Sequence, residues 1–312
     1  MTTVEKDGVE SFHKESYEKH ADWYTKLFPS DEDKKQQLRK LTHKNSINDW
    51  LQSIFFSCID PLLNDKKGSW LTVGDAYGLD ANYILSKSVT EVVATDLSTG
   101  FLKVSLQEGL ITKYMAENAE HLSGADSSVD YVLCKEAYHH FPRPYAALYE
   151  MIRVAKKAIV IIEPQDPISK MPLLLWATNL LGAIHPKYVS KVWKNRFSYE
   201  PVGNFVYKVS EREFEKFAGG LGFPLVAFKK INPNFWYMGI DQYQAVPQEK
   251  RFRKVQFKKA IFDLLVRIGL ISSQVLGTVV FKELPDARTV SLMKKEGYKF
   301  VDIPKNPYAG MS

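Results

Sequence analysis

Cysteine is scarce in this sequence of 312 residues. Its two cysteines, Cys58 and Cys134, show no metal-ligand spacing, and the second lies in the strand-like segment VDYVLCK. Long apolar runs are also missing. The longest, from Pro172 to Ile184, contains Asn179 and Gly182 and is shorter than the roughly 20 residues needed to cross a bilayer. The N-terminus lacks the apolar stretch of a secretion signal. The sequence predicts a reduced, metal-free, cytoplasmic protein with no membrane-spanning helix.

Basic charge is concentrated in one part of the chain. The formal net charge is only +6, yet residues 185–275 contain 16 Lys or Arg against 7 Asp or Glu. This excess indicates either an anionic partner or a solvated basic surface.

Within that region, residues 249–270 interleave bases with apolar side chains at near-helical spacing. Such a helix can pack on its own domain, or it can lie on an anionic membrane or against an anionic glycan. A membrane contact would make the protein peripheral at the inner membrane surface. No recognisable RNA- or DNA-binding module accompanies the helix, so we expect no nucleic-acid partner.

Strand and helix patterns alternate after an N-terminal helical region. Apolar strand-like segments with helical patterns between them predict a parallel, doubly wound sheet, because parallel crossovers need connecting helices. The expected strands are WLTV, EVVATD, a short one in ITKYMA, SVDYVLCK, AIVIIEP, LVAFKKI and TVVFKEL. Ser210 and Glu213 form a capping box for a helix that ends near Gly222. Two insertions remain, at roughly 165–207 and 232–275, and we expect them to build a lid or substrate pocket.

The loop from Gly74 to Gly78, GDAYG, joins the first strand to a helix. Small residues there let backbone N–H groups approach a ligand at a helix N-terminus. Asp96 ends the next strand about 20 residues on, where a carboxylate accepts hydrogen bonds from ribose hydroxyls. The loop lacks the third glycine of G-x-G-x-x-G, which favours S-adenosylmethionine (SAM) over NAD.

The ordered segments VGDAYG, ATDLS, AENAEHL, SSVDYVLCKEAYHHFPRP and YEMIRVAKKAIVIIEP resemble the successive motifs of class I SAM-dependent methyltransferases. The resemblance spans about residues 70–164. The segment CKEAYHHFPRPYAALYEMIRV also resembles a bacterial subgroup associated with sugar and surface-polysaccharide modification.

The resemblance implies a Rossmann-like core with added parts. The expected division is an N-terminal helical cap at 1–68, a SAM-binding core at 69–164, lid insertions with a late core helix and strand at 165–275, and a final strand and tail at 276–312.

The same resemblance implies a set of cofactor contacts. Positions along the methionine moiety and ribose are Gly74, Asp75, Ala76 and Gly78. Asp96 would hold the ribose hydroxyls, and Leu97 would pack on adenine. Asn118 and Ala119 would lie beside the adenine amine, with an amide in place of the usual acid. Lys135 and Glu136 would lie beneath the transferring methyl group. Thr72 and Ala76 depart from the common pattern, which affects the expected methionine contacts.

Methyl transfer needs aligned reactants and, for a hydroxyl acceptor, a nearby base. His139 and His140 are the leading candidates for this base, and Glu136 is a further candidate. Each also has a structural alternative: one histidine stacking over the cofactor loop, the other capping a helix, and Glu136 holding the SAM amine.

Further positions have both a functional and a structural interpretation. His185 either faces the acceptor or lies on the lid surface. Tyr17, His20 and Tyr24 either close over the cofactor or pack on the core. Glu163 either contacts substrate or is a solvated strand end.

The sequence thus predicts a SAM-dependent methyltransferase, with S-adenosylhomocysteine as product, that methylates oxygen on a sugar or other small polar acceptor, such as a surface polysaccharide or lipid-linked glycan. The alternatives are an N-methyltransferase acting on an amino sugar or natural-product amine, and a noncatalytic SAM-binding module. A nicotinamide-dependent oxidoreductase is a weaker one. Acceptor identity and oligomeric state are not encoded in these motifs.

Overall fold

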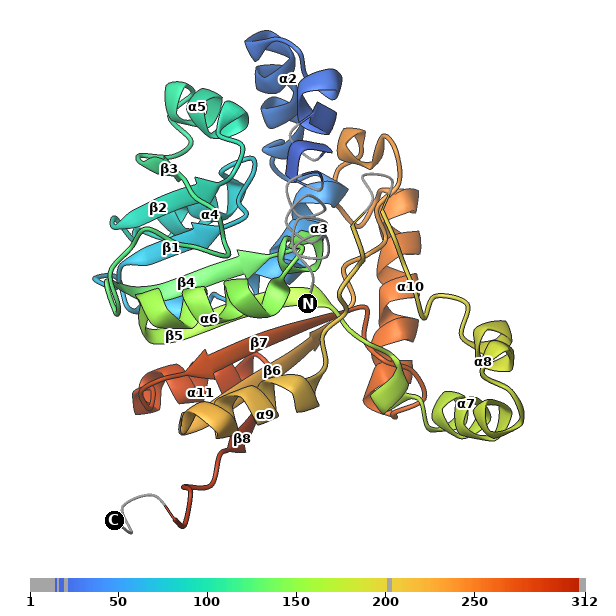
Figure 1. The fold of residues 1–312 in the computed structure, drawn as a ribbon. Coiled ribbons are helices and arrows are strands. Elements are labelled where there is room, and N and C mark those ends of the chain that lie inside the picture. The colour runs from blue at the N-terminus through green and yellow to red at the C-terminus, as the bar shows by residue number, and fades with distance from the viewer. Residues whose placement is uncertain (1–14, 16, 20–21, 201–203, 309–312) are drawn as a thin grey trace.

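The computed structural model describes residues 15, 17–19, 22–200 and 204–308 (Figure 1). A single mixed sheet of eight strands, in the order β3-β2-β1-β4-β5-β7-β6-β8, runs through its centre. The strands are β1 Trp70–Val73, β2 Val92–Asp96, β3 Tyr114–Ala116, β4 Val129–Lys135, β5 Ala155–Pro164, β6 Leu225–Ile231, β7 Val275–Phe281 and β8 Lys299–Asp302. Strands β1 to β5 pair in parallel, and β7 is antiparallel to both β5 and β6. The predicted Rossmann-like, mostly parallel sheet is confirmed.

One strand was not predicted from the sequence. Strand β8 pairs antiparallel with β6 at the edge of the sheet. Its four residues are exposed or half-buried, so they lack the apolar run that marks a central strand. The predicted seven strands therefore become eight, and the order of the core is unchanged.

Helices cover both faces of the sheet. The α-helices are α2 Asp31–Leu41, α3 Ile47–Phe56, α4 Leu79–Ser86, α5 Gly100–Gln107, α6 Pro144–Val154, α7 Pro172–Ile184, α8 Pro186–Val192, α9 Glu211–Leu221, α10 Lys250–Arg267 and α11 Ala287–Lys295. Short 3-10 helices are η1 Leu62–Asn64, η2 Tyr138–His140, η3 Ile168–Lys170 and η4 Ile240–Gln242. One buried cluster joins the sheet to α3, η1, α4, α5 and α11, and another joins the opposite face to α6 and α9.

Local sequence signals place the ends of these helices. The Ser210 side chain accepts from the Glu213 N–H, the Glu213 side chain accepts from the Ser210 N–H, and α9 ends at Gly222 with a φ of 72°. This is the predicted capping box with a left-handed C-terminal residue. Pro144 opens α6 at the first helical position, where its missing N–H costs nothing.

The N-terminal helices are packed on the core. Phe55, Ile59 and Leu62 are almost fully buried beneath the sheet, so α3 and η1 form part of one helical layer. Helix α2 instead rests on α5, with Leu38 buried against Phe101. Among the described residues of the predicted cap, α3 and η1 support the sheet, whereas α2 packs on α5.

The two insertions lie beyond the carboxyl edge of the sheet (Figure 1). The chain leaves β5 to form η3, α7 and α8, and it leaves β6 to form η4 and α10. Helix α10 buries Phe252 and Val255 against Ile47 and Leu51 of α3, so one of its faces packs on the chain's own core. In the part of the chain that the structure describes, no helix is both long and apolar enough to cross a membrane.

Gly277, in the middle of β7, gives a test of the packing between α3 and the sheet. A Cβ at this position would lie 2.6 Å from Cys58 Sγ. We expect Gly277→Ala to lower the free energy of unfolding by about 1–3 kcal/mol, because overpacking displaces a well-packed core. Urea unfolding measures this change, and adding Cys58→Ala should restore part of it.

Gly220→Ala in α9 is the matched control, since a Cβ added at Gly220 would have no neighbouring atom within 4 Å. It should be neutral or slightly stabilising, because alanine favours a helix. Equal losses in the two alanine variants would contradict a steric cause at Gly277.

Candidate functional site

A cavity of about 320 Å³ opens at the carboxyl ends of β1, β2 and β4. This is the edge where open α/β sheets bind ligands. The cavity is lined by Tyr17, Tyr24, Gly74, Ala76, Asp96, Leu97, Ser98, Glu117, Asn118, Ala119, Glu136, Ala137, His140 and Phe141. The structure thus brings together most of the residues that the sequence assigns to the cofactor, and it places two of the three candidate bases beside them.

The loop after β1 touches the segment after β4. Gly74 has a φ of 73°, and a Cβ there would lie 2.4 Å from the Cβ of Ala137. Only glycine fits this close approach, which leaves the loop backbone open to a ligand. Gly78 also has a positive φ, of 71°, and begins α4, where a Cβ would crowd Ile111. Gly74 therefore lines the cavity, whereas Gly78 shapes the turn behind it.

Asp75 holds the loop to α4. Its buried carboxylate accepts hydrogen bonds from Thr72 Oγ1 at 3.0 Å and from the Ala81 N–H at 2.9 Å. Burial raises the pKa of Asp75. Asp75 does not line the cavity, so it supports the binding loop from behind. Thr72, which departs from the pattern that the resemblance implies, provides one of the donors that satisfy this carboxylate.

Asp96 presents a carboxylate to the cavity. Its Oδ1 accepts from the Ser98 N–H at 2.8 Å. Burial, reinforced by the nearby charge of Asp75, raises the pKa of Asp96 to about 6. Adjacent Leu97 exposes 46% of its surface, which gives the cavity an apolar wall of the kind that packs on a base. Ser98 is a lining residue that the sequence did not single out.

Asn118 and Ala119 form the far wall. Asn118 Oδ1 accepts from the Tyr17 hydroxyl at 3.4 Å and from the Glu120 N–H at 2.9 Å, so its amide offers a ligand an N–H donor. Tyr24 lines the cavity and also packs edge-on against Tyr77 and Phe101. His20 lies outside the described residues. Two tyrosines of the predicted cap therefore line the cavity, and Tyr24 also packs on the core.

Lys135 lies away from the cavity. Its ammonium forms a buried ion pair with Asp80 Oδ1 at 3.2 Å and lies over the rings of Phe55 and Phe56. Burial raises the pKa of Asp80 to about 7, against the opposing pull of Lys135. In this structure Lys135 compensates buried acids behind the site and makes no direct contribution to the cavity wall.

Glu136 lines the cavity in a strained conformation. Its φ is 53°, which is unusual for a residue with a long side chain. Its Oε1 is buried and has no hydrogen-bond partner among the described residues. Burial raises the pKa of Glu136 to about 7; Glu163 adds to this rise, while Lys135 and His139 oppose it. A carboxyl held in this way can exchange a proton near neutral pH.

The two histidines have different environments. His139 is 7% exposed and donates from Nδ1 to Glu163 Oε2 at 2.5 Å, while His140 lines the cavity. Burial lowers the pKa of His139, but the Glu163 carboxylate prevails and raises it to about 9. Glu163 is fully buried and also accepts from the Ala137 and Tyr138 N–H groups, each at 2.8 Å. The interpretation of Glu163 as a solvated strand end is therefore wrong.

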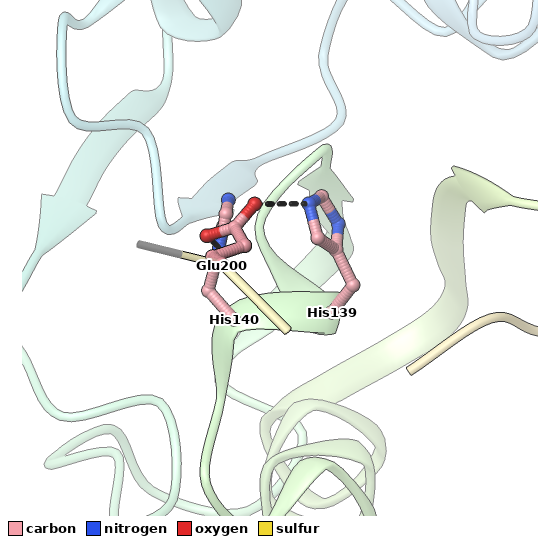
Figure 2. A group of neighbouring side chains, drawn as sticks. All are labelled: His139, His140 and Glu200. Carbon is pink, nitrogen blue, oxygen red and sulfur yellow. Dashed lines mark ion pairs between the residues drawn. The ribbon is translucent and has the colours of Figure 1, made fainter. Parts of the chain in front are cut away.

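Glu200, from the first insertion, is a site residue that sequence reasoning missed. Its carboxylate lies 2.7 Å from His140 Nδ1 and 3.9 Å from His139 Nε2 (Figure 2). The sequence predicts no metal-ligand cluster, yet ligand atoms of these three residues lie within 4.8 Å of one another. No spacing rule could reveal this group, because 60 residues and a lid separate the carboxylate from the histidines. His185 is exposed and begins α8, where its Nδ1 accepts from the Lys187 N–H, so it lies on the lid surface.

The fold and the cavity define a Rossmann-like protein with a cavity at the carboxyl edge of its sheet. Comparison with known proteins makes this more specific: residues 71–162 match the family model described as a methyltransferase domain. This match bears out the methyltransferase domain that the motif series predicts at about residues 70–164.

One curated relative and two solved structures show how far the similarity extends. The demethylmenaquinone methyltransferase of Paenarthrobacter aurescens (strain TC1) is 32% identical over 111 residues, which are 35% of this chain and 44% of that protein. The chain thus spans less than half the length of the curated relative it matches.

One similar solved structure is the 1,6-didemethyltoxoflavin-N1-methyltransferase of Burkholderia thailandensis with bound 1,6-didemethyltoxoflavin and S-adenosylhomocysteine. Its TM-score to this chain is 0.50 at 11% sequence identity, and the aligned region covers 87% of this chain and 91% of that protein. Another is the magnesium protoporphyrin IX methyltransferase of Synechocystis PCC 6803 with bound SAH, which has a TM-score of 0.44 at 15% sequence identity. The aligned region covers 69% of this chain and 92% of that protein.

Asp96→Asn tests the ribose contact. Ribose hydroxyls donate to the ionised carboxyl, so affinity for S-adenosylhomocysteine should rise as pH increases through about 6. The variant should bind about 10- to 100-fold more weakly and lose this pH dependence, because it removes hydrogen bonds to a charged group. Calorimetric titration between pH 5 and 8 measures both effects.

The melting temperature at pH 8 should rise in Asp96→Asn, since a buried charge is removed. Glu283→Gln, an exposed position just after β7, is the control and should change neither property. Unchanged affinity in Asp96→Asn would contradict the assignment of this carboxylate to the ribose.

Proposed function

We propose that the chain is a SAM-dependent methyltransferase that transfers a methyl group to an oxygen atom of a small polar acceptor. The observation that carries this proposal is the position of Glu136: a carboxyl with a buried, unpartnered oxygen lies in the same cavity as Gly74 and Asp96, as far as the described residues extend. A nucleoside site adjoining a group ready to take a proton is the arrangement that methylation of a hydroxyl requires.

SAM supplies a methyl group already activated by its sulfonium, so the protein's own residues have two tasks. The loop at Gly74, with Asp96, Leu97 and Asn118, orients the nucleoside. Glu136 receives the acceptor proton as the new bond forms, and its pKa of about 7 suits this exchange. His139, held by Glu163, does not line the cavity and positions the segment that bears His140.

Glu136→Gln tests the assignment of the base. With an oxygen acceptor we expect turnover to fall by roughly 100- to 10,000-fold, the usual contribution of a general base. Binding of S-adenosylhomocysteine should stay within a few-fold of the parent. In the parent, turnover should increase with pH through about 7, because only the ionised carboxyl accepts a proton.

Glu91→Gln, at an exposed position before β2, is the matched control and should keep full turnover. A fall of less than tenfold in Glu136→Gln would favour the nitrogen-acceptor alternative, since an amine needs no strong base. Cofactor binding without turnover on any acceptor, in parent protein, would favour the noncatalytic module.

A sugar, or a glycan carried on a lipid, is the acceptor class that we propose. The resemblance of CKEAYHHFPRP to polysaccharide-modifying proteins supports it, and so does the surface around the insertions. Phe257, Ile261 and Leu264 of α10, and Ile268 directly after it, expose 67%, 41%, 57% and 64% of their surfaces. They recur at steps of three and four residues, so they form one apolar stripe on the face opposite the buried Phe252.

Bases flank this stripe. Arg253, Lys254 and Lys258 are on exposed turns of α10 beside Phe257 and Ile261. Helix α7, beyond the same edge of the sheet, adds Leu173 and Trp176, which are 76% and 66% exposed (Figure 1). An apolar stripe bordered by positive charge suits an anionic lipid surface. We propose that these helices place the protein on the cytoplasmic face of the inner membrane, where a lipid-linked acceptor would be within reach.

Sedimentation with vesicles tests this contact. The protein should bind vesicles that contain phosphatidylglycerol more tightly than neutral phosphatidylcholine vesicles, and salt should weaken the binding. The double variant Phe257→Glu, Leu264→Glu should lose at least tenfold in vesicle affinity. The double variant Leu221→Glu, Leu284→Glu, at exposed positions elsewhere, adds the same charges and should still bind. Equal binding by both variants would contradict the contact.

A further inference from the structure

Two imidazoles and a carboxylate meet at the border of the cofactor cavity. His139 and His140 come from η2, and Glu200 comes from the first insertion (Figure 2). Ligand bonds to a first-row divalent ion measure about 2.0–2.2 Å, so two ligand atoms on one ion lie up to roughly 4.4 Å apart. The observed group, within 4.8 Å, needs only small side-chain shifts to close on an ion. Such an ion would replace the His140–Glu200 contact of 2.7 Å.

The orientation of His139 is fixed in the way that metal-binding histidines require. Its Nδ1–H donates to Glu163 Oε2, so Nε2 is the atom turned toward Glu200, at 3.9 Å. A carboxylate behind the ring fixes its tautomer and increases the basicity of the other nitrogen. Glu163 is itself held by two backbone N–H groups, which leaves the ring little freedom to turn.

A buried oxygen beside the group provides an independent observation. Asn204 is 3% exposed, and its Oδ1 has no hydrogen-bond partner among the described residues; its amide nitrogen lies 3.5 Å from His140 Nδ1. Rotation of the amide by half a turn would bring that oxygen to the ring. Buried acceptors without donors are rare in folded proteins, and a bound cation satisfies them.

We propose that His139 Nε2, His140 Nδ1 and the Glu200 carboxylate bind one divalent first-row transition-metal ion, such as Zn²⁺, Mn²⁺ or Co²⁺, with Asn204 Oδ1 as an additional ligand. Two histidines and one carboxylate are a donor set that such ions prefer. The ion would tie the first insertion to η2. Because His140 also lines the cofactor cavity, an open coordination position there would receive the acceptor oxygen, a consequence that rests on the proposed methyl transfer.

The test is metal binding by the full chain, measured without any methyl acceptor. Chelator-treated protein is titrated with Co²⁺ and followed by its visible absorption, and bound Zn²⁺ and Mn²⁺ are counted after equilibrium dialysis. We expect one ion per chain. Glu200→Gln and His140→Gln should each weaken binding by at least tenfold, and Glu163→Gln by about 10- to 100-fold through loss of ring orientation.

His185→Gln is the matched control, since it removes an exposed histidine from the same insertion, and it should bind as the parent does. A native circular-dichroism spectrum and a cooperative thermal transition show that each variant is folded, and the parent chain is also tested for binding of S-adenosylhomocysteine. A chain that binds this nucleoside but no ion, or ion binding that is equal in all variants, would overturn the metal site. Ion binding without nucleoside binding would leave the metal site standing and remove the methyltransferase proposal.

Discussion

The buried carboxylate of Glu163 at the end of β5 is the constraint on which the cavity depends. It accepts hydrogen bonds from the backbone of Ala137 and Tyr138 and from the His139 ring, and these bonds fix the course of the backbone after β4. That course presses Ala137 against Gly74 and turns Glu136 into the cavity. One acid therefore sets the position of the nucleoside loop, of the candidate base and of the two histidines.

Burial of acids gives the site its chemistry at the expense of stability. Asp75, Asp80, Asp96 and Glu136 all have pKa values raised by burial, and Lys135 provides a buried positive charge that opposes the rise at three of them. Groups of this kind destabilise the fold when they ionise, because the charge has lost its water. A protein retains them where they bind or react. Lys135 thus contributes to the site through charge compensation, even though it does not line the cavity.

The sequence predicted the parts of this structure that depend on local pattern. The apolar runs of the central strands, the capping box of α9, and the order of Gly74, Asp96 and Asn118 along the chain all follow from short-range rules. Strand β8 was not predicted, because this edge strand is half-exposed and lacks an apolar run. The roles of Glu163 and Glu200 depend on contacts across 24 and 60 residues, and no periodicity encodes such contacts. The resemblance assigns Lys135 to the cofactor from its place in the motif series, and that place does not fix the direction of its side chain, which points to Asp80.

The two insertions both follow strands at the carboxyl edge of the sheet, but they contribute to different surfaces of the protein. In a parallel sheet, the connections that follow β5 and β6 leave from the carboxyl edge, so added residues there lengthen the wall of the site without disturbing the strands. The first insertion turns Glu200 and Asn204 inward against η2, where they meet the cavity. The second packs one face of α10 on α3 and leaves the other face apolar, basic and open. In the proposed methyltransferase the core would supply the nucleoside contacts, so the choice of acceptor would depend on these added segments and on the surface they present.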